Sequence, residues 1–92
     1  MRRSSTVLSA TSHQVLSHLH PETKRSIRRA LEELSNNPYV GKPLKEELAG
    51  LWSLPVSHHR IIYQIEASAI TIVFIGPRRD VYERLRESLT EK

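Results

Sequence analysis

The sequence predicts a small α+β domain in which a mostly antiparallel sheet is covered by a few helices. Three observations support this fold class. A chain of 92 residues suffices for one thin core. Its first half carries apolar residues at helical spacing, and three strand-like segments follow one another between residues 51 and 76. We therefore expect residues 1–92 to form a single domain with the order β-α-α-β-β-β-α and four strands.

The first half is expected to contain one strand and a hairpin of two helices. Residues 4–9, "STVLSA", alternate weakly and predict the first strand. Thr11 or Ser12 is expected to cap a helix that ends near Leu19. Pro21 suits the first position of the second helix. Four apolar residues at helical spacing give this helix its buried face: Ile27, Ala30, Leu31 and Leu34.

The second half is expected to form the sheet and a final helix. Residues 39–50 contain two glycines and one proline and predict a loop with one helical turn. The expected strands are residues 51–56, 60–67 and 69–76. Pro55 cannot donate to a strand ladder, so we expect the first of these three at the sheet edge. Asp80 and Glu83 form a capping-box pair that predicts the start of the last helix.

Basic and aromatic side chains are expected to gather where the sheet meets the final helix. Strand alternation places Arg60 on the face opposite the larger apolar residues of its strand. If those apolar residues face the helices, Arg60 lies on the open face. Arg78 follows the last strand, and Tyr82 lies one turn into the final helix. Guanidinium groups neutralise phosphate, and an aromatic ring stacks on an unpaired base, so this grouping suits RNA.

Composition narrows the class of protein further. The net charge is +4 and arginine outnumbers lysine ten to four, which favours nucleic acid or an acidic protein as partner. The chain has no cysteine, which excludes disulfides, thiolate chemistry and cysteine-based metal sites. The longest apolar segment, "AITIVFI", is far too short to cross a bilayer, and the N-terminal segment has no secretory signal pattern. We expect a cytoplasmic protein without membrane contact.

The stretch "LKEELAGLWSLPVSHHRIIYQIEASAITIVFIGPRRDVYERL", residues 44–85, resembles the C-terminal half of toxins of the RelE/ParE superfamily. The parts that carry the resemblance are "GLW", "HRIIYQIE" and "IGPRRDVYERL". It implies a RelE-like fold and a toxin of a type II toxin–antitoxin system, an endoribonuclease that cleaves mRNA on the ribosome and so inhibits translation. It also implies that no metal or other cofactor is needed. The implied partners are a cognate antitoxin in a hetero-oligomer, the ribosome and mRNA.

The resemblance assigns roles to individual residues. Those that receive catalytic roles are Arg60, Arg78 and Tyr82. Relatives often carry basic residues at two alternate strand positions where this chain has Ser53 and Pro55, and histidine or lysine in place of Pro77. A usual source of the general acid or base is therefore missing. Candidate replacements for proton transfer are His58, His59, Glu46, Glu47 and Lys45.

Further basic residues are candidates for binding RNA or the ribosome. They are Arg79, Lys24, Arg25, Arg28, Arg29 and Lys45. A solvated helix face explains the four basic residues between positions 24 and 29 equally well, and an ion pair with Glu83 explains Arg79.

Two other functions stay open. ParE-like members of the superfamily inhibit DNA gyrase by binding it and are not enzymes, and the missing basic residues at Ser53 and Pro55 favour that reading. The other alternative is a catalytically silent relative that acts only as a binding module.

Overall fold

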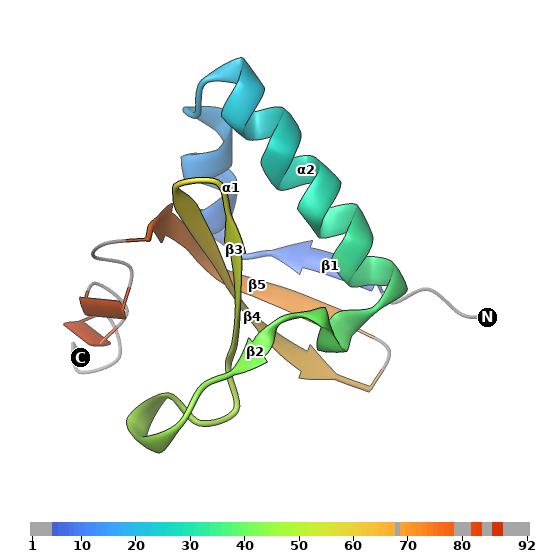
Figure 1. Ribbon diagram of the computed structural model, residues 1–92, viewed down its shortest axis with the longest axis vertical. Coiled ribbons are helices and arrows are strands. Elements are labelled where there is room, and N and C mark those ends of the chain that lie inside the picture. The colour runs from blue at the N-terminus through green and yellow to red at the C-terminus, as the bar shows by residue number, and fades with distance from the viewer. Residues whose placement is uncertain (1–4, 68, 79–81, 84–85, 88–92) are drawn as a thin grey trace.

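The computed structural model describes residues 5–67, 69–78, 82–83 and 86–87, and a five-stranded mixed sheet forms its centre (Figure 1). The strands are β1 (Ser5–Leu8), β2 (Lys42–Pro43), β3 (Trp52–Val56), β4 (His59–Glu66) and β5 (Ala69–Pro77). Their order across the sheet is β1-β5-β4-β3-β2. β1 runs parallel to β5, and the other neighbouring pairs are antiparallel.

The prediction of four strands is wrong, because β2 is a fifth. It consists of two residues, too few to show any periodicity, and one of them is a proline. β2 pairs with Trp52 and Ser53 of β3. The prediction that β3 forms the sheet edge is therefore wrong for its first half. No described strand pairs with the outer side of β3 at Pro55, as its missing N–H requires.

The two predicted helices are present as α1 (Ala10–Ser17) and α2 (Pro21–Asn36). Thr11 and Ser12 do not cap α1, because both lie within it. Ser9 is the N-cap, and its Oγ accepts a hydrogen bond from the Ser12 backbone N–H at 3.1 Å. Pro21 occupies the first turn of α2 as predicted, and the His20 side chain accepts from the Glu22 N–H.

The main core lies between the two helices and one face of the sheet. Its buried residues are Leu16, Ile27, Ala30, Leu34, Ile61, Tyr63, Ile70, Ile72 and Ile75. Ile61 and Tyr63 thus face the helices, which confirms the predicted alternation of β4. Figure 1 shows α2 on one side of β3 and β4 and the helical pieces 82–83 and 86–87 on the other. Arg60 and Ile62 accordingly belong to the open face.

The segment between α2 and β3 contains two short 3₁₀ helices rather than one helical turn. They are η1 (Pro38–Val40) and η2 (Glu46–Leu48). The buried Tyr63 hydroxyl anchors this segment, since it donates to the Pro38 carbonyl at 2.8 Å and accepts from the Gly41 N–H at 3.1 Å. Desolvation by burial raises the pKa of Tyr63, and the hydrogen bond from Gly41 partly opposes it.

A register shift shapes the open face of the sheet. It falls between Ile62, which pairs with Phe74, and Tyr63, which pairs with Ile72. Val73 is the extra residue, and both Val73 and Phe74 pack with Ile62 on the open face. Residues 82–83 and 86–87 are helical and so agree with the predicted final helix, whereas its expected cap, Asp80, lies outside the described residues.

Candidate functional site

The candidate site lies on the open face, where β3, β4 and the C-terminal segment meet. Arg60 Nη1 donates a hydrogen bond to Ser53 Oγ at 2.9 Å. The Tyr82 hydroxyl donates to the same Ser53 oxygen at 3.1 Å. The Arg60 guanidinium carbon also lies 5.1 Å from the centre of the Tyr82 ring, a cation–π distance. The structure therefore brings Arg60 and Tyr82 together, with Ser53 between them.

An apolar cluster on the open face packs against Tyr82. Leu48 of η2 and Ile62 of β4 are its buried members. The partly buried side chains that pack against them are Leu44, Leu51, Val73, Phe74 and Tyr82. Tyr82 thus rests its ring on apolar side chains while its hydroxyl reaches Ser53. The position of the Tyr82 ring is therefore set by this apolar cluster and by the hydrogen bond to Ser53 on β3.

Arg60 is half-buried, and several of its guanidinium N–H donors have no partner among the described residues. Its Nε is buried without a hydrogen-bond partner in the described part of the chain. No ion pair joins Arg60 to a carboxylate of the described residues. A guanidinium carries five N–H donors, and the neutral Ser53 hydroxyl satisfies one of them here. A phosphate could accept from the Nη donors that Ser53 leaves free and neutralise the charge, which is the chemistry an RNA site needs.

Arg78 lies at the same end of the sheet as Arg60. Its backbone N–H donates to the His58 carbonyl at 2.9 Å, which ties the end of β5 to the turn before β4. Within the sheet, Arg60 pairs with Gly76, two residues before Arg78. The Arg78 side chain is exposed. The structure thus places Arg78 beside the Arg60–Tyr82 pair without a direct contact to either side chain among the described interactions.

The two candidate histidines differ in position. His58 lies exposed in the turn that joins β3 to β4, next to Ser57, whose φ of 57° is left-handed. His59 pairs with Val56, which belongs to the helix-facing core, and its Nδ1 is buried without a partner in the described part. Because neighbouring strand residues face opposite ways, His59 points away from the face that carries Arg60. The structure does not bring His59 to the site.

The other candidates for proton transfer lie around η2. Lys45 is the exposed N-cap residue of this turn, and Glu46 adopts a φ of 58°. Glu47 accepts from Arg86 Nε at 3.0 Å, an ion pair in which both side chains are more than half exposed. This pair connects η2 to the C-terminal segment that carries Tyr82. Since both groups are solvated, it contributes only ~0–1 kcal/mol.

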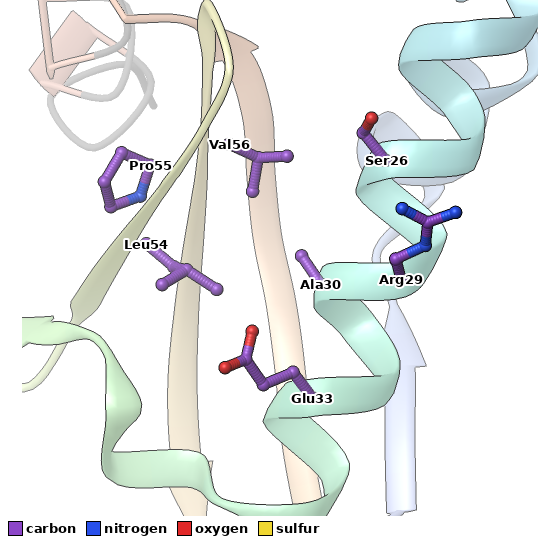
Figure 2. Close-up of a pocket in the computed structure, with 7 residues that line it drawn as sticks. All are labelled: Ser26, Arg29, Ala30, Glu33, Leu54, Pro55 and Val56. Atoms are coloured by element: carbon purple, nitrogen blue, oxygen red, sulfur yellow. The ribbon is translucent and has the colours of Figure 1, made fainter.

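The basic residues of α2 lie away from the Arg60–Tyr82 pair. Lys24, Arg25 and Arg28 line one hollow of about 250 Å³ with Pro21. Arg29 lies instead beside a groove of about 240 Å³ between α2 and β3. Figure 2 shows Leu54 and Val56 pointing from β3 toward α2 across this groove. Arg79 lies outside the described residues.

Ser53 is the member of the site that sequence reasoning missed. The sequence marked it only as a place where a basic residue is absent. Strand alternation puts Ser53 on the face opposite Trp52 and Leu54, as its register with Ile62 confirms. A polar residue predicted to be on the same sheet face as Arg60 was the available signal.

The described residues contain neither a group of metal ligands nor a membrane-spanning helix. No group of three or more His, Cys, Asp or Glu side chains in that part of the chain could hold a metal ion. None of the helices it contains is long and apolar enough to span a membrane.

The fold and the family match identify a small toxin of the RelE/ParE superfamily, a component of type II toxin–antitoxin systems. Residues 16–82 match the family described as ParE toxin of type II toxin–antitoxin system, parDE. The match covers well over half of the chain, and the protein belongs to this family.

Individual relatives agree with this assignment. Toxin RelG of Mycobacterium tuberculosis is 40% identical over 58 residues, which cover 60% of this chain and 67% of that protein. The toxin–antitoxin complex RelBE2 of the same organism contains a chain that is 28% identical, with a TM-score of 0.77 over 87% of this chain and 97% of that one. The isolated RelE toxin of E. coli, 14% identical, shares the fold with a TM-score of 0.71 over 94% of this chain and 98% of its own.

Proposed function

We propose that this toxin is a metal-independent endoribonuclease that cleaves mRNA on the ribosome and so inhibits translation. The observation that carries the proposal is the meeting of Arg60 and Tyr82 at Ser53 on the open face, with Arg78 at the same end of the sheet. The similarity to toxins named RelG and RelE supports the same activity.

The reaction would be a transfer within the RNA backbone. The ribose 2′-oxygen attacks the adjacent phosphorus, so an O2′–P bond forms while the bond from phosphorus to the 5′-oxygen breaks. The 2′-hydroxyl gives up a proton, and the leaving 5′-oxygen takes one up. Charge on the phosphate oxygens grows in the transition state, and Arg60 and Arg78 would stabilise it. Tyr82 would stack on an unpaired base.

The hydrogen bond to Ser53 limits what Tyr82 does chemically. Its hydroxyl proton is donated to Ser53 Oγ, so in this arrangement the proton does not point at a substrate. The Tyr82 ring packs against the apolar cluster around Leu48 and Ile62, and this ring is the part suited to stacking on a base. Tyr82 would therefore position RNA rather than transfer a proton.

Proton transfer is assigned to His58 within this proposal. Its carbonyl accepts the hydrogen bond from the Arg78 backbone, so the two residues are neighbours at the sheet end. An imidazole exchanges protons near neutral pH, which suits a general base or acid. His59 lies on the helix-facing side, and Lys45, Glu46 and Glu47 lie around η2.

Basic residues outside the site would hold the toxin on ribosomal or messenger RNA. Lys24, Arg25 and Arg28 line one hollow of α2, so their charges would act together on one stretch of phosphates. Arg29, Lys45 and Arg79 are further candidates for the same electrostatic attraction.

A cognate antitoxin would be the protein partner, in the cytoplasm of the producing cell. Several solved relatives are toxin–antitoxin complexes, RelBE2 among them. We propose that the antitoxin neutralises this toxin by covering its open face or by displacing the segment that carries Tyr82. The first route would block RNA from reaching Arg60, and the second would remove the Tyr82 ring from the site.

Inhibition of DNA gyrase by binding is the second candidate function. The matched family is described as ParE toxin, and the chain has Ser53 and Pro55 where RelE-like relatives often carry basic residues. A catalytically silent binding module is a variant of the same alternative. Both predict that messages stay intact when the toxin is produced.

One experiment separates these functions. The toxin is induced without its antitoxin, and mRNA 5′ ends and plasmid supercoiling are measured in the same cells. The proposal predicts cuts in phase with codons that disappear in Arg60→Ala and Arg78→Ala. Glu66→Gln, at the opposite end of β4, is the matched control and should cut like the wild type. Intact messages with altered supercoiling would establish the gyrase alternative instead.

A further inference from the structure

Ser53 occupies a position that the proposed chemistry does not yet explain. It is 1% exposed, although it is a polar residue in the middle of β3. It pairs with Ile62, two residues along β4 from Arg60, which pairs with Pro55. A buried hydroxyl is costly unless it is hydrogen-bonded, and here both of its bonding partners are candidate site residues.

We propose that Ser53 is a positioning residue for RNA cleavage, whose hydroxyl holds the Arg60 guanidinium and the Tyr82 ring in one fixed arrangement. The inference rests on the proposed function and adds a residue to its site. Ser53 itself touches no reacting atom in this proposal. It acts through Arg60, which would contact the phosphate undergoing cleavage, and through Tyr82, which would stack on the RNA.

The geometry leaves Ser53 little freedom. A serine oxygen has two acceptor positions, and the donors from Arg60 at 2.9 Å and Tyr82 at 3.1 Å fill both. Arg60 is thereby held twice, by this hydrogen bond and by the Tyr82 ring 5.1 Å away. The three side chains form a closed set in which moving one disturbs the other two. Arginine otherwise samples many rotamers, and fixing them before the reaction lowers the entropy cost of reaching the transition state.

The same geometry explains why a serine suits this position better than a lysine would. A lysine ammonium has three donors and no acceptor, so it could accept a hydrogen bond from neither the Arg60 guanidinium nor the Tyr82 hydroxyl. It would also place a like charge against the half-buried Arg60, whose Nε already lacks a described partner. A serine at position 53 adds no positive charge to the site, but its oxygen fixes the position of the Arg60 guanidinium.

The test measures cleavage kinetics on ribosomes that carry a defined mRNA. Ser53→Ala removes the shared acceptor, and we expect kcat to fall on the order of ten- to hundredfold while KM changes less than about threefold. Ser53→Thr keeps an oxygen at the same atom, and we expect it to recover kcat to within about fivefold of wild type. In an Arg60→Ala background, Ser53→Ala should lower kcat less than it does in the wild type, because only the contact with Tyr82 is then left to lose.

Ser12→Ala is the matched control. Ser12 is equally buried, at 0% exposed, and its hydroxyl bonds the Ile72 carbonyl at 3.2 Å on the helix side. Loss of this buried hydroxyl should lower stability without lowering the kcat of the folded toxin. If Ser53→Ala and Ser12→Ala affect kcat alike, or if Ser53→Thr is as impaired as Ser53→Ala, Ser53 is only structural and the proposal is wrong.

Nuclear magnetic resonance of the Arg60 guanidinium separates this inference from the proposed function. Restricted rotation at Nη should be seen in the wild type and in Ser53→Thr, and should disappear in Ser53→Ala. If the wild type cleaves no mRNA, the proposed function is wrong and the catalytic part of this inference falls with it. If the wild type cleaves and Arg60 rotates freely in it, only the role of Ser53 is overturned.

Discussion

At the scale of single residues, Tyr82 is the side chain whose two halves have separable roles. Its ring contacts the Leu48–Ile62 cluster and the Arg60 guanidinium, while its hydroxyl contacts Ser53. Because the ring would stack on RNA and the hydroxyl would only orient it, the two functions should respond differently to mutation.

Substitutions at Tyr82 test this division. Tyr82→Phe keeps the ring, and we expect mRNA cleavage within about tenfold of wild type, the effect of one missing hydrogen bond. Tyr82→Ala removes the ring together with its cation–π and apolar interactions, and should cost at least another tenfold, equivalent to ~1.4 kcal/mol or more. Single-turnover cleavage on programmed ribosomes measures both. Equal activity of the two variants would contradict a stacking role.

Tyr63 makes a second prediction at this scale, about stability and pH. Its pKa in the folded protein lies above the ordinary value of 10.0, chiefly because the ring is buried. The folded state therefore favours the neutral phenol, and that contribution is fully present below pH 10.0 and is lost as the pH rises through the folded pKa. We expect the free energy of unfolding to fall as the pH rises above 10.0.

Urea unfolding at several pH values measures this fall. Tyr63→Phe is the comparison, because it removes the titrating group and keeps the ring. The variant should be less stable at neutral pH, where it lacks the bonds to Pro38 and Gly41, and its stability should fall less steeply in alkali. An equally steep fall in the variant would show that another group titrates there.

At the scale of elements, α2 is held to the sheet by apolar burial. Ile27 and Leu34 are both 0% exposed and pack against β4 and β5 residues. Leu34→Ala should lower the free energy of unfolding by about 2–5 kcal/mol, because it removes buried apolar surface and leaves a cavity. Val7→Ala on β1, where the side chain is 54% exposed, is the control and should cost less than about 1 kcal/mol. Thermal or urea unfolding compares the two.

The C-terminal segment makes the next prediction at this scale. Among its described residues, the Tyr82 side chain and the Arg86–Glu47 ion pair connect it to the rest of the protein. Since Arg86 and Glu47 are more than half exposed, Arg86→Ala should change stability by less than about 1 kcal/mol and cleavage by less than about threefold. A larger effect would mean that the ion pair, rather than Tyr82, keeps this segment on the open face.

Some secondary-structure elements could be predicted from the sequence, and others could not. Strong periodicity located α2 and the three late strands, and strand alternation correctly separated Arg60 from Ile61 and Tyr63. The two-residue β2 and the cap of α1 were not predictable, because each is decided by contacts distant in sequence. Ser12 was a reasonable cap candidate, but its hydroxyl instead bonds Ile72, sixty residues away.

The candidate site could be predicted only in part, because some of its contacts join residues that are distant in sequence. Alternation and the family resemblance pointed to Arg60 and Tyr82, and the structure brings them together. Their common contact with Ser53 depends on how the C-terminal segment folds back over β3, which local patterns do not report. Likewise, only the strand register shows that His59 faces the helices while His58 remains beside Arg78.

At the scale of the whole molecule, the charge distribution suits a protein that binds RNA at more than one place. The net charge is +4, and Lys24, Arg25 and Arg28 line a hollow on α2, outside the apolar cluster that carries Tyr82. Attraction between these residues and RNA phosphates would release counterions, so it should weaken as salt rises.

Replacing Lys24, Arg25 and Arg28 by alanine tests this surface. We expect weaker ribosome binding and a shallower dependence of affinity on salt, with the slope reduced by about one unit for each phosphate that is no longer neutralised. The kcat at saturating ribosomes should stay within about threefold, because these residues do not contact the Arg60–Tyr82 pair. Glu22→Gln on the same helix is the control and should not weaken binding. An unchanged salt slope in the triple variant would show that these charges face solvent only.

The most direct test of the central claim is cleavage by purified toxin of a defined mRNA held on ribosomes, mapped by primer extension. The claim is that Arg60 and Arg78 on the open face stabilise the phosphate undergoing cleavage. It predicts cuts at one position relative to the codon in the ribosome, reduced by at least a hundredfold in Arg60→Ala and Arg78→Ala and retained in Glu66→Gln. Uncut mRNA with the wild type, or equal cutting by the arginine variants, would contradict it.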